Sequence, residues 1–331
     1  MKIAILGNGG WGTAMALHLH RLGHSVYVWG ALPQEVEEIA RRRENATYLK
    51  GVPLPEAIRF THNEQLAAGG AGLVILAPPS RYFRDICRRF APFIPPYTPV
   101  LSLTKGICEQ TGERMSEIAR TELANRNIAV LSGPSHAEEV AREIPTAVVA
   151  ASHNEILARL VQETVSGPRL RVYTSSDTLG VEIGGTVKNI IAIAVGASDG
   201  LGFGDNTRAA LITRGLAEMT RLGVALGAKT ETFSGLSGLG DLVVTCTSRH
   251  SRNHHVGEEL GRGRTISEIL SGMKMVAEGY WNARVIDRIA REHAVEMPIT
   301  RAVYNLCFEN ATPAEAVAAL MNREVKPESP A

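Results

Sequence analysis

The first half of the chain alternates between short apolar runs and longer segments in which apolar side chains recur every three to four positions. The first pattern is typical of strands and the second of helices that bury one face. The predicted strands are Lys2–Leu6, Ser25–Trp29, Ile58–Thr61, Leu73–Ala77, Val100–Leu103, Ile128–Leu131, Ala147–Ala151 and Leu170–Tyr173. The predicted helices between them are Gly12–Leu22, Pro33–Arg43, Tyr82–Ala91, Gly112–Ala124 and Glu155–Ser166. This alternation indicates a doubly wound, mostly parallel sheet, and the wholly apolar run Leu73–Ala77 fits a strand covered on both faces.

The pattern becomes helical after about Asp177, and no further strand is predicted. The predicted helices are Val181–Ser198, Thr207–Leu226, His255–Gly261, Ile266–Ser271, Tyr280–Glu292, Ile299–Phe308 and Pro313–Met321. We therefore expect an α/β domain over residues 1–180 and an all-helical domain over 181–331. Sites commonly lie at domain interfaces, so we expect one between these two.

A glycine-rich loop follows the first predicted strand and reads GNGGWG from Gly7 to Gly12. This is the GxGxxG arrangement at a strand-to-helix turn, which indicates a Rossmann-like dinucleotide-binding domain. Gly7 would permit the tight turn, Gly9 the approach of a pyrophosphate, and Gly12 close packing of helix on strand. Trp11 either packs against the domain or lines the cofactor cleft.

The end of the second predicted strand does not select between NAD and NADP. An acid there would hold the ribose 2′-hydroxyl of NAD, and an arginine would favour the 2′-phosphate of NADP. Trp29 is instead followed by Gly30, Ala31, Leu32 and Pro33. The arginines at positions 41 to 43 lie further on and are interpreted as a solvated helix face.

Three segments carry candidate chemistry. Lys105 directly follows a predicted strand and points into the expected crevice, unless it is a surface lysine at a turn. Ser132–Ala137 forms a small-residue loop with hydroxyls and free backbone N–H groups. Lys188 lies in an otherwise apolar helix, so it is either desolvated with a lowered pKa or extends its ammonium to the surface.

Two later segments suit a phosphorylated substrate. The run Leu236–Leu242 is rich in glycine for a helical domain, which indicates tight functional turns. Ser251, Arg252 and Asn253 follow it, and a guanidinium binds phosphate through two hydrogen bonds. The alternative is an exposed Arg-Asn turn. We assign no role to His254 or His255.

Composition narrows the classes of partner. The net charge is +1, so no nucleic-acid or anionic-membrane footprint is expected. Four widely spaced cysteines form no CxxC pair, which predicts no metal site and suits a reducing compartment. The apolar stretch Ile190–Ala197 is far shorter than the ~18 residues of a membrane span, so we expect a cytoplasmic protein without one.

Taken together and in order, these segments closely resemble the bacterial NAD(P)-dependent glycerol-3-phosphate dehydrogenase family. The resemblance runs from residue 1 to about residue 320. The matching segments are GNGGWGTA, LTKG, SGPSHAEEV, EIGGTVKNIIAIAVG, GLSGLGDLVVTCTS and SRNHHVG. It implies a Rossmann-like domain followed by an all-α domain of the 6-phosphogluconate dehydrogenase-like type. It also implies interconversion of dihydroxyacetone phosphate and sn-glycerol 3-phosphate, which supplies phospholipid synthesis, in a homodimer.

The resemblance further implies roles for individual residues. It makes Lys188 the residue that exchanges the proton with the substrate. From the chemistry, we predict that Lys105 stabilises negative charge on the reacting oxygen and that Asp241 orients Lys188 or a substrate hydroxyl. The implied substrate-binding residues are Lys105, Gly133, Ser135, Lys188, Asn189, Asp241, Ser251, Arg252 and Asn253. The implied cofactor-binding residues are Gly7, Gly9, Gly10, Trp11, Gly12, Lys105, Ala137, Arg252, Val276 and Glu278.

Two departures from the family pattern concern the cofactor. Gly10 stands where many members have serine, and Gly30-Ala31 stands where an arginine or histidine is usual. The choice between NADPH and NADH is therefore open. Two other functions are considered: another hydroxyacid dehydrogenase of the 6-phosphogluconate dehydrogenase-like group, and a non-catalytic nucleotide-sensing protein. The glycine-rich turn with Ser251–Asn253 disfavours the first, and the two lysines disfavour the second.

Overall fold

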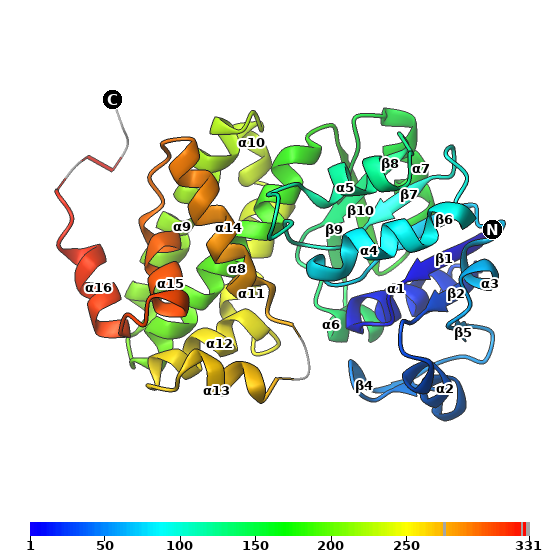
Figure 1. The fold of residues 1–331 in the computed structure, drawn as a ribbon, viewed down its shortest axis with the longest axis horizontal. Coiled ribbons are helices and arrows are strands. Elements are labelled where there is room, and N and C mark those ends of the chain that lie inside the picture. Colours follow the sequence, from blue (N-terminus) through cyan, green and yellow to red (C-terminus); the bar gives the residue numbers. More distant parts are fainter. Residues whose placement is uncertain (274–275, 326, 329–331) are drawn as a thin grey trace.

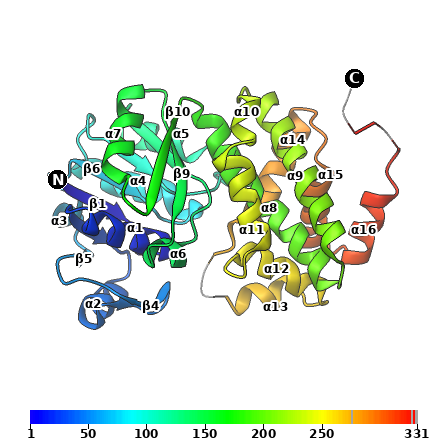
Figure 2. The same ribbon diagram turned by 180° about the vertical axis from the view of Figure 1, so that it is seen from behind.

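A sheet domain and a helical domain lie side by side in the computed structural model, which describes residues 1–273, 276–325 and 327–328 (Figures 1 and 2). The sheet has eight strands in the order β10-β9-β8-β7-β6-β1-β2-β5. These strands are β1 Lys2–Leu6, β2 Ser25–Trp29, β5 Arg59–Thr61, β6 Leu73–Leu76, β7 Val100–Ser102, β8 Ile128–Ser132, β9 Thr146–Ala151 and β10 Leu170–Ser175. All neighbouring pairs are parallel except β8 and β9. The strand order reverses between β1 and β6, which is where such sheets bind ligands.

Both faces of the sheet are buried, because the apolar strands alternate their side chains between two cores. In β1, Ile3 and Ile5 belong to one core, and Ala4 and Leu6 to the other. The first core is covered by α1 Gly10–Arg21, α6 Ala137–Ala141 and α7 Glu155–Val165. The second is covered by α3 Glu64–Ala68, α4 Ser80–Phe90 and α5 Met115–Glu122. The predicted doubly wound sheet is thus confirmed.

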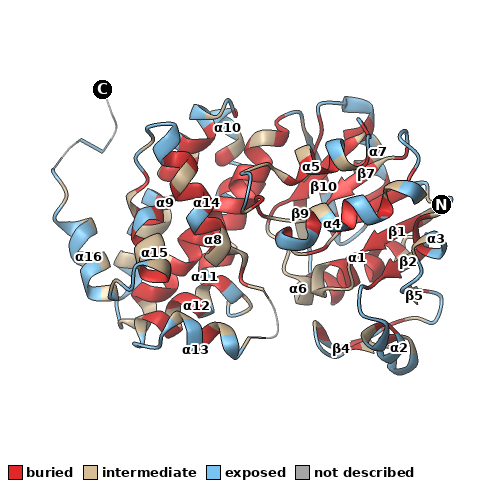
Figure 3. Cartoon of the chain, viewed as in Figure 1, coloured by how far each residue is buried: buried red, intermediate tan, exposed pale blue. Residues whose placement is uncertain are grey.

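The helical domain is built around one long helix, α8 (Thr178–Gly200), which is buried along most of its length (Figure 3). The surrounding helices are α9 Asp205–Ala225, α10 Thr230–Phe233, α11 Asp241–Thr247, α12 Arg252–Gly261, α13 Ile266–Ser271, α14 Glu278–Glu292, α15 Pro298–Phe308 and α16 Pro313–Met321. The sheet ends at Ser175 and α8 crosses residue 180 without interruption, so the domain division after that residue stays a prediction.

Among the described residues, α8 is the one helix with the length and mean hydropathy of a membrane span. However, 89% of its most apolar window is buried inside the protein, as in the central helix of a globular domain.

A buried carboxylate joins α8 to the sheet domain. Glu182 accepts hydrogen bonds from Ser116 N at 2.8 Å and from Ser116 Oγ at 2.6 Å. Arg114 forms an ion pair with it at 2.8 Å. Burial raises the pKa of Glu182, although Arg114 opposes this effect. One side chain of the central helix is therefore anchored in the neighbouring domain.

Glycines let α12 pack directly on the backbone of α8. A Cβ at Gly257 would lie 2.0 Å from the carbonyl oxygen of Ile193, and one at Gly196 would lie 2.0 Å from that of His254. Gly200 and Gly261 repeat the arrangement one turn further along each helix. This contact sets the position of the first turn of α12, where Arg252 lies.

The differences from the sequence prediction are short or local. The helix predicted over Gly112–Ala124 begins at Met115, because Gly112 has φ +77° and forms a turn. Sequence reasoning missed the paired strands β3 (Glu44–Asn45) and β4 (Leu49–Pro53), which lie outside the main sheet. It also missed the short helices α3, α6, α10 and α11 and a π-helical turn over Leu236–Gly240.

We expect Gly257→Ala to destabilise the protein by roughly 3 kcal/mol, because the added methyl group meets the α8 backbone and forces the helices apart. Urea unfolding measures the change. Gly272→Ala is the matched control, since its Cβ would meet no atom of the described residues closer than 3.6 Å. Unchanged stability in Gly257→Ala would contradict the backbone contact.

Candidate active site

Asp241 lies between two lysine ammonium groups at the junction of the domains. Lys188 Nζ donates to Asp241 Oδ1 at 2.7 Å, and Lys105 Nζ donates to Asp241 Oδ2 at 2.7 Å. Lys188 Nζ also donates to Thr245 Oγ1 at 2.7 Å, and that hydroxyl donates to the carbonyl of Asp241 at 2.6 Å. Each carboxylate oxygen thus holds one ammonium group.

The three charged residues come from three separate elements. Lys188 lies mid-way along α8, Lys105 follows β7, and Asp241 begins α11 directly after the π-helical turn. Glycines in α8 let the π-helical turn that precedes Asp241 pack closely against this helix. A Cβ at Gly184 would lie 2.6 Å from the carbonyl oxygen of Ser237, which belongs to that turn. A local departure from α-helical geometry often marks a functional site, and here it delivers Asp241 to the lysines.

Burial and the ion pairs shift the pKa values of Lys188 and Asp241. Lys188 and Asp241 are buried, whereas Lys105 is only partly so. Burial lowers the pKa of Lys188 to about 8, although Asp241 opposes this. Burial tends to raise the pKa of Asp241, but Lys105 and then Lys188 outweigh it, so that pKa lies below its usual value. The site therefore holds a carboxylate and an ammonium group that can release its proton near neutral pH.

The loop after β8 provides two hydrogen-bond acceptors for Lys105. Its ammonium donates to the carbonyl of Gly133 at 2.9 Å and to Ser135 Oγ at 3.4 Å. Ser132 Oγ lies 3.5 Å from Asp241 Oδ2. The pKa of His136 is lowered by burial and by the nearby charge of Lys188, which favours a neutral ring at neutral pH.

The three residues predicted to hold a phosphate lie at the start of α12, in different settings. Ser251 caps the helix by accepting from His254 N at 3.2 Å. Arg252 is exposed and donates to the carbonyl of Val276 at 3.0 Å. Asn253 is buried and donates to Asn189 Oδ1 at 2.8 Å.

Asn253 is partly committed to the protein itself. Its Oδ1 accepts from Gly279 N at 2.9 Å, so it joins α8, α12 and α14. Asn189 Nδ2 in turn donates to the carbonyl of Gly185 at 3.2 Å. Each amide nitrogen thus makes one of the two hydrogen bonds that it can donate.

The glycine loop fits a dinucleotide. Among the described residues, no side chain caps the start of α1, so its first N–H groups can bind phosphate. A Cβ at Gly9 would meet no atom of the described residues within 4 Å, which marks open space, whereas one at Gly12 would lie 2.2 Å from the carbonyl of Gly7. Trp11 Nε1 is buried without a hydrogen-bond partner among the described residues. Ala137 lies beside this loop, 3.6 Å from a Cβ built at Gly10.

Glu278 begins α14 and reaches across to the sheet domain. Its Oε1 accepts from Ser80 N at 2.9 Å, and its Oε2 accepts from Ser80 Oγ. Ser80 is the first residue of α4, shortly after β6 at the reversal of strand order. Glu278 thus lies at the expected crevice between the domains, and Val276 is tied to Arg252 close by.

The predicted residues therefore form connected groups rather than one cluster. The lysines, Asp241, Gly133 and Ser135 share one hydrogen-bonded network, and Asn189, Asn253 and Gly279 share another. Sequence reasoning gave no role to Thr245, although its spacing of four from Asp241 places both on one helix face. Ser80 carried no recognisable signal.

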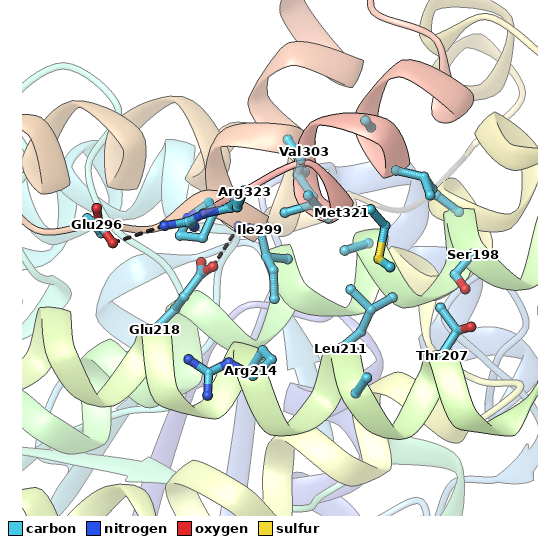
Figure 4. A pocket seen from close by; sticks show the side chains of 18 of the residues that line it. Ser198, Thr207, Leu211, Arg214, Glu218, Glu296, Ile299, Val303, Met321 and Arg323 are labelled. Carbon is cyan, nitrogen blue, oxygen red and sulfur yellow. Dashed lines mark hydrogen bonds and ion pairs between the residues drawn. The ribbon is translucent and has the colours of Figure 1, made fainter. Parts of the chain in front are cut away.

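A separate cavity of about 580 Å³ lies between α8, α9, α15 and α16 (Figure 4). It is lined by apolar side chains such as Leu211 and Met321, and by Glu218, which accepts from Ile299 N at 2.6 Å. None of the residues predicted for the site lines this cavity.

Comparison with known proteins agrees with this arrangement. The model of the NAD-dependent glycerol-3-phosphate dehydrogenase N-terminus matches residues 2–158, and that of the C-terminus matches residues 177–318. A protein of Geobacter sp. (strain M21) named glycerol-3-phosphate dehydrogenase (NAD(P)+) is 49% identical over 330 residues, covering 99% of this chain and 98% of that protein. A protein of the same name, numbered 2, from Salinibacter ruber is 47% identical over 330 residues, covering 99% and 96%.

The crystal structure of glycerol-3-phosphate dehydrogenase from Coxiella burnetii has the same fold. Its TM-score is 0.94 at 42% identity, covering 97% of this chain and 99% of that one. The family resemblance of the sequence motifs is thereby confirmed. The chain belongs to the NAD-dependent glycerol-3-phosphate dehydrogenase family.

Proposed function

We propose that this protein interconverts dihydroxyacetone phosphate and sn-glycerol 3-phosphate with NADH or NADPH as the redox partner. The observation that carries the proposal is the buried Lys188–Asp241–Lys105 network in a chain of this family. A carbonyl-reducing site needs a proton donor and a positive charge beside the reacting oxygen, and the two lysines supply both.

Lys188 is the proton-exchanging group. A bound nicotinamide would supply the hydride for reduction and accept it in oxidation. Lys188 Nζ donates a proton to the C2 oxygen during reduction and takes it back during oxidation. Asp241 fixes the direction of this ammonium group, and Thr245 restricts it further.

Lys105 stabilises the negative charge that develops on the C2 oxygen. Its ammonium is partly exposed and already directed to Asp241 and the Gly133–Ser135 loop, so little reorganisation is needed when substrate binds. Gly133 and Ser135 contact the substrate from the same loop. The proposal thus keeps Lys188, Lys105 and Asp241 as the catalytic residues.

The remaining substrate contacts hold the phosphate away from the reacting atom. Arg252 and Ser251 lie at the N-terminus of α12, where the guanidinium and the N–H groups that Ser251 does not cap both favour an anion. Asn189 and Asn253 present their remaining amide protons beside it. Binding energy from the phosphate would then position C2 against the lysines.

Ten residues are proposed to hold the cofactor. Its pyrophosphate would rest on the glycine loop at the start of α1, and its nicotinamide end would lie near Lys105 and the domain junction. The proposed residues are Gly7, Gly9, Gly10, Trp11, Gly12, Lys105, Ala137, Arg252, Val276 and Glu278. The uncapped helix and the unpartnered Trp11 Nε1 support this assignment.

The function is tested by mixing the protein with dihydroxyacetone phosphate and either NADH or NADPH, and following the loss of reduced-nicotinamide absorbance. We expect turnover with at least one cofactor and formation of sn-glycerol 3-phosphate. Lys188→Ala should lower kcat by about two orders of magnitude or more, because the proton donor is lost. A folded wild-type protein that oxidises neither cofactor would refute the proposal.

The two directions should respond oppositely to pH. Lys188 has a pKa of about 8, and reduction needs its ammonium form whereas oxidation needs the free amine. We expect kcat for reduction to fall, and kcat for oxidation to rise, as the pH increases through about 8. Steady-state rates at saturating substrate measure both profiles. Parallel profiles in the two directions would exclude Lys188 as the titrating group.

We further propose that the protein is a cytoplasmic homodimer that supplies glycerol 3-phosphate for phospholipid synthesis. No residue of α16 is buried, although the helix is rich in apolar side chains (Figure 3). Met321, at its end, is 78% exposed. A second copy would cover such a surface. Sedimentation equilibrium should give twice the mass of the 331-residue chain, and a monomer would remove this part of the proposal.

A further inference from the structure

An acidic side chain stands beside the glycine loop at the position where cofactors are distinguished. Glu35 lies in the first turn of α2 (Pro33–Arg42), just after β2. Asn8 Nδ2, in the glycine loop, donates to Glu35 Oε2 at 3.4 Å, and Tyr48 Oη donates to Glu35 Oε1 at 3.4 Å. Glu35 is only partly exposed, so its carboxylate is held at this edge rather than free in solvent.

In domains that bind NAD, the acid that holds the ribose stands at the end of the second strand, where this chain has Gly30. Steric contacts leave no room for a side chain at this position. A Cβ at Gly30 would lie 2.6 Å from Val36 Cγ2 and 3.0 Å from Asn8 Cγ. Asn8 therefore occupies the space where a side chain from the end of β2 would lie. It contacts Glu35 there, so the carboxylate reaches the same region from one turn later in the sequence.

The β3–β4 segment fixes this arrangement. Asn45 Nδ2 donates to the carbonyl of Asn8 at 2.7 Å and to Thr13 Oγ1 at 2.8 Å. Asn45 Oδ1 accepts from Tyr48 N at 3.2 Å. Asn45 is buried, so both partners of Glu35 are tied to one rigid side chain.

Two arginines near Glu35 bind other groups of the protein. Arg42 forms an ion pair with Glu38 at 3.0 Å, and Arg43 donates to the carbonyl of Ile58 at 3.1 Å. A carboxylate accepts hydrogen bonds from ribose hydroxyls but repels a 2′-phosphate, which needs a cation.

We propose that Glu35 is the specificity-determining residue for the dinucleotide and that it makes NADH, rather than NADPH, the preferred cofactor. This inference rests on the proposed function for the identity of the dinucleotide as a cofactor. Glu35 accepts from the ribose hydroxyls, Asn8 and Tyr48 orient its two oxygens, and its charge excludes the 2′-phosphate.

The test is equilibrium binding of NADH and NADPH to the full chain, followed by tryptophan fluorescence quenching, with turnover as a second readout. We expect the wild type to bind NADH at least about tenfold more tightly than NADPH, because like charges are brought together by NADPH. Glu35→Gln should reduce this ratio to within about threefold, mainly through tighter binding of NADPH. Glu35→Arg should reverse it.

Glu37→Gln is the matched control, because it removes the same charge from an exposed position on the same helix. Its NADH-to-NADPH ratio should equal that of the wild type, and thermal unfolding verifies that every variant is folded. Equal or tighter binding of NADPH by the wild type overturns the inference, as does a ratio that Glu35→Gln leaves unchanged.

The outcomes separate this inference from the proposed function. Preferential NADH binding without turnover of dihydroxyacetone phosphate would refute the function but support the role of Glu35. Turnover with a preference for NADPH would support the function but refute the role of Glu35. Binding of neither dinucleotide would refute both.

Discussion

The site depends on one buried carboxylate that two cations share. Removing Asp241 from water is costly, and its two short ion pairs are the main compensation for that cost. Because the lysines come from different domains, this interaction exists only when the helical domain packs on the sheet at the observed place. Two neighbouring features serve this packing. The glycines of α8 allow close contact with the π-helical turn, and that turn places Asp241 beside the lysines.

Close backbone packing extends the same constraint to the rest of the helical domain. Gly196 and Gly257 bring α8 and α12 into direct contact, and Gly279 brings α14 against the carbonyl of Asn189. The reacting lysine and the proposed phosphate-binding residues are therefore held on helices with little freedom to shift. Such rigidity keeps a substrate at the distance that catalysis requires.

Much of the fold could be predicted from the sequence, because long elements carry a repeated pattern. Strands β1 and β2 have the predicted bounds, since their apolar runs end at a glycine loop and a glycine. The short helices α6 and α10 contain too few residues to show a periodicity. Lys105 and Asp241 are 136 positions apart, so their pairing depends on tertiary packing that no local pattern contains. Glu35 was missed because an acid is expected at the end of β2, where this chain has glycine. Only the tertiary contact with Asn8 shows that a carboxylate from the next helix lies beside the glycine loop.

The anchorage of Glu182 constrains how the two domains can move. It lies six positions before Lys188 on the same buried helix, and it is bound to Arg114 and Ser116 of the sheet domain. Pulling these groups apart would leave an unpaired buried charge, which costs about 3–5 kcal/mol. Glu278 makes a second link of this kind, because it accepts from Ser80 of the sheet domain. Separating the two domains would therefore leave two carboxylates without their partners, so both ends of the proposed site are tied across the junction.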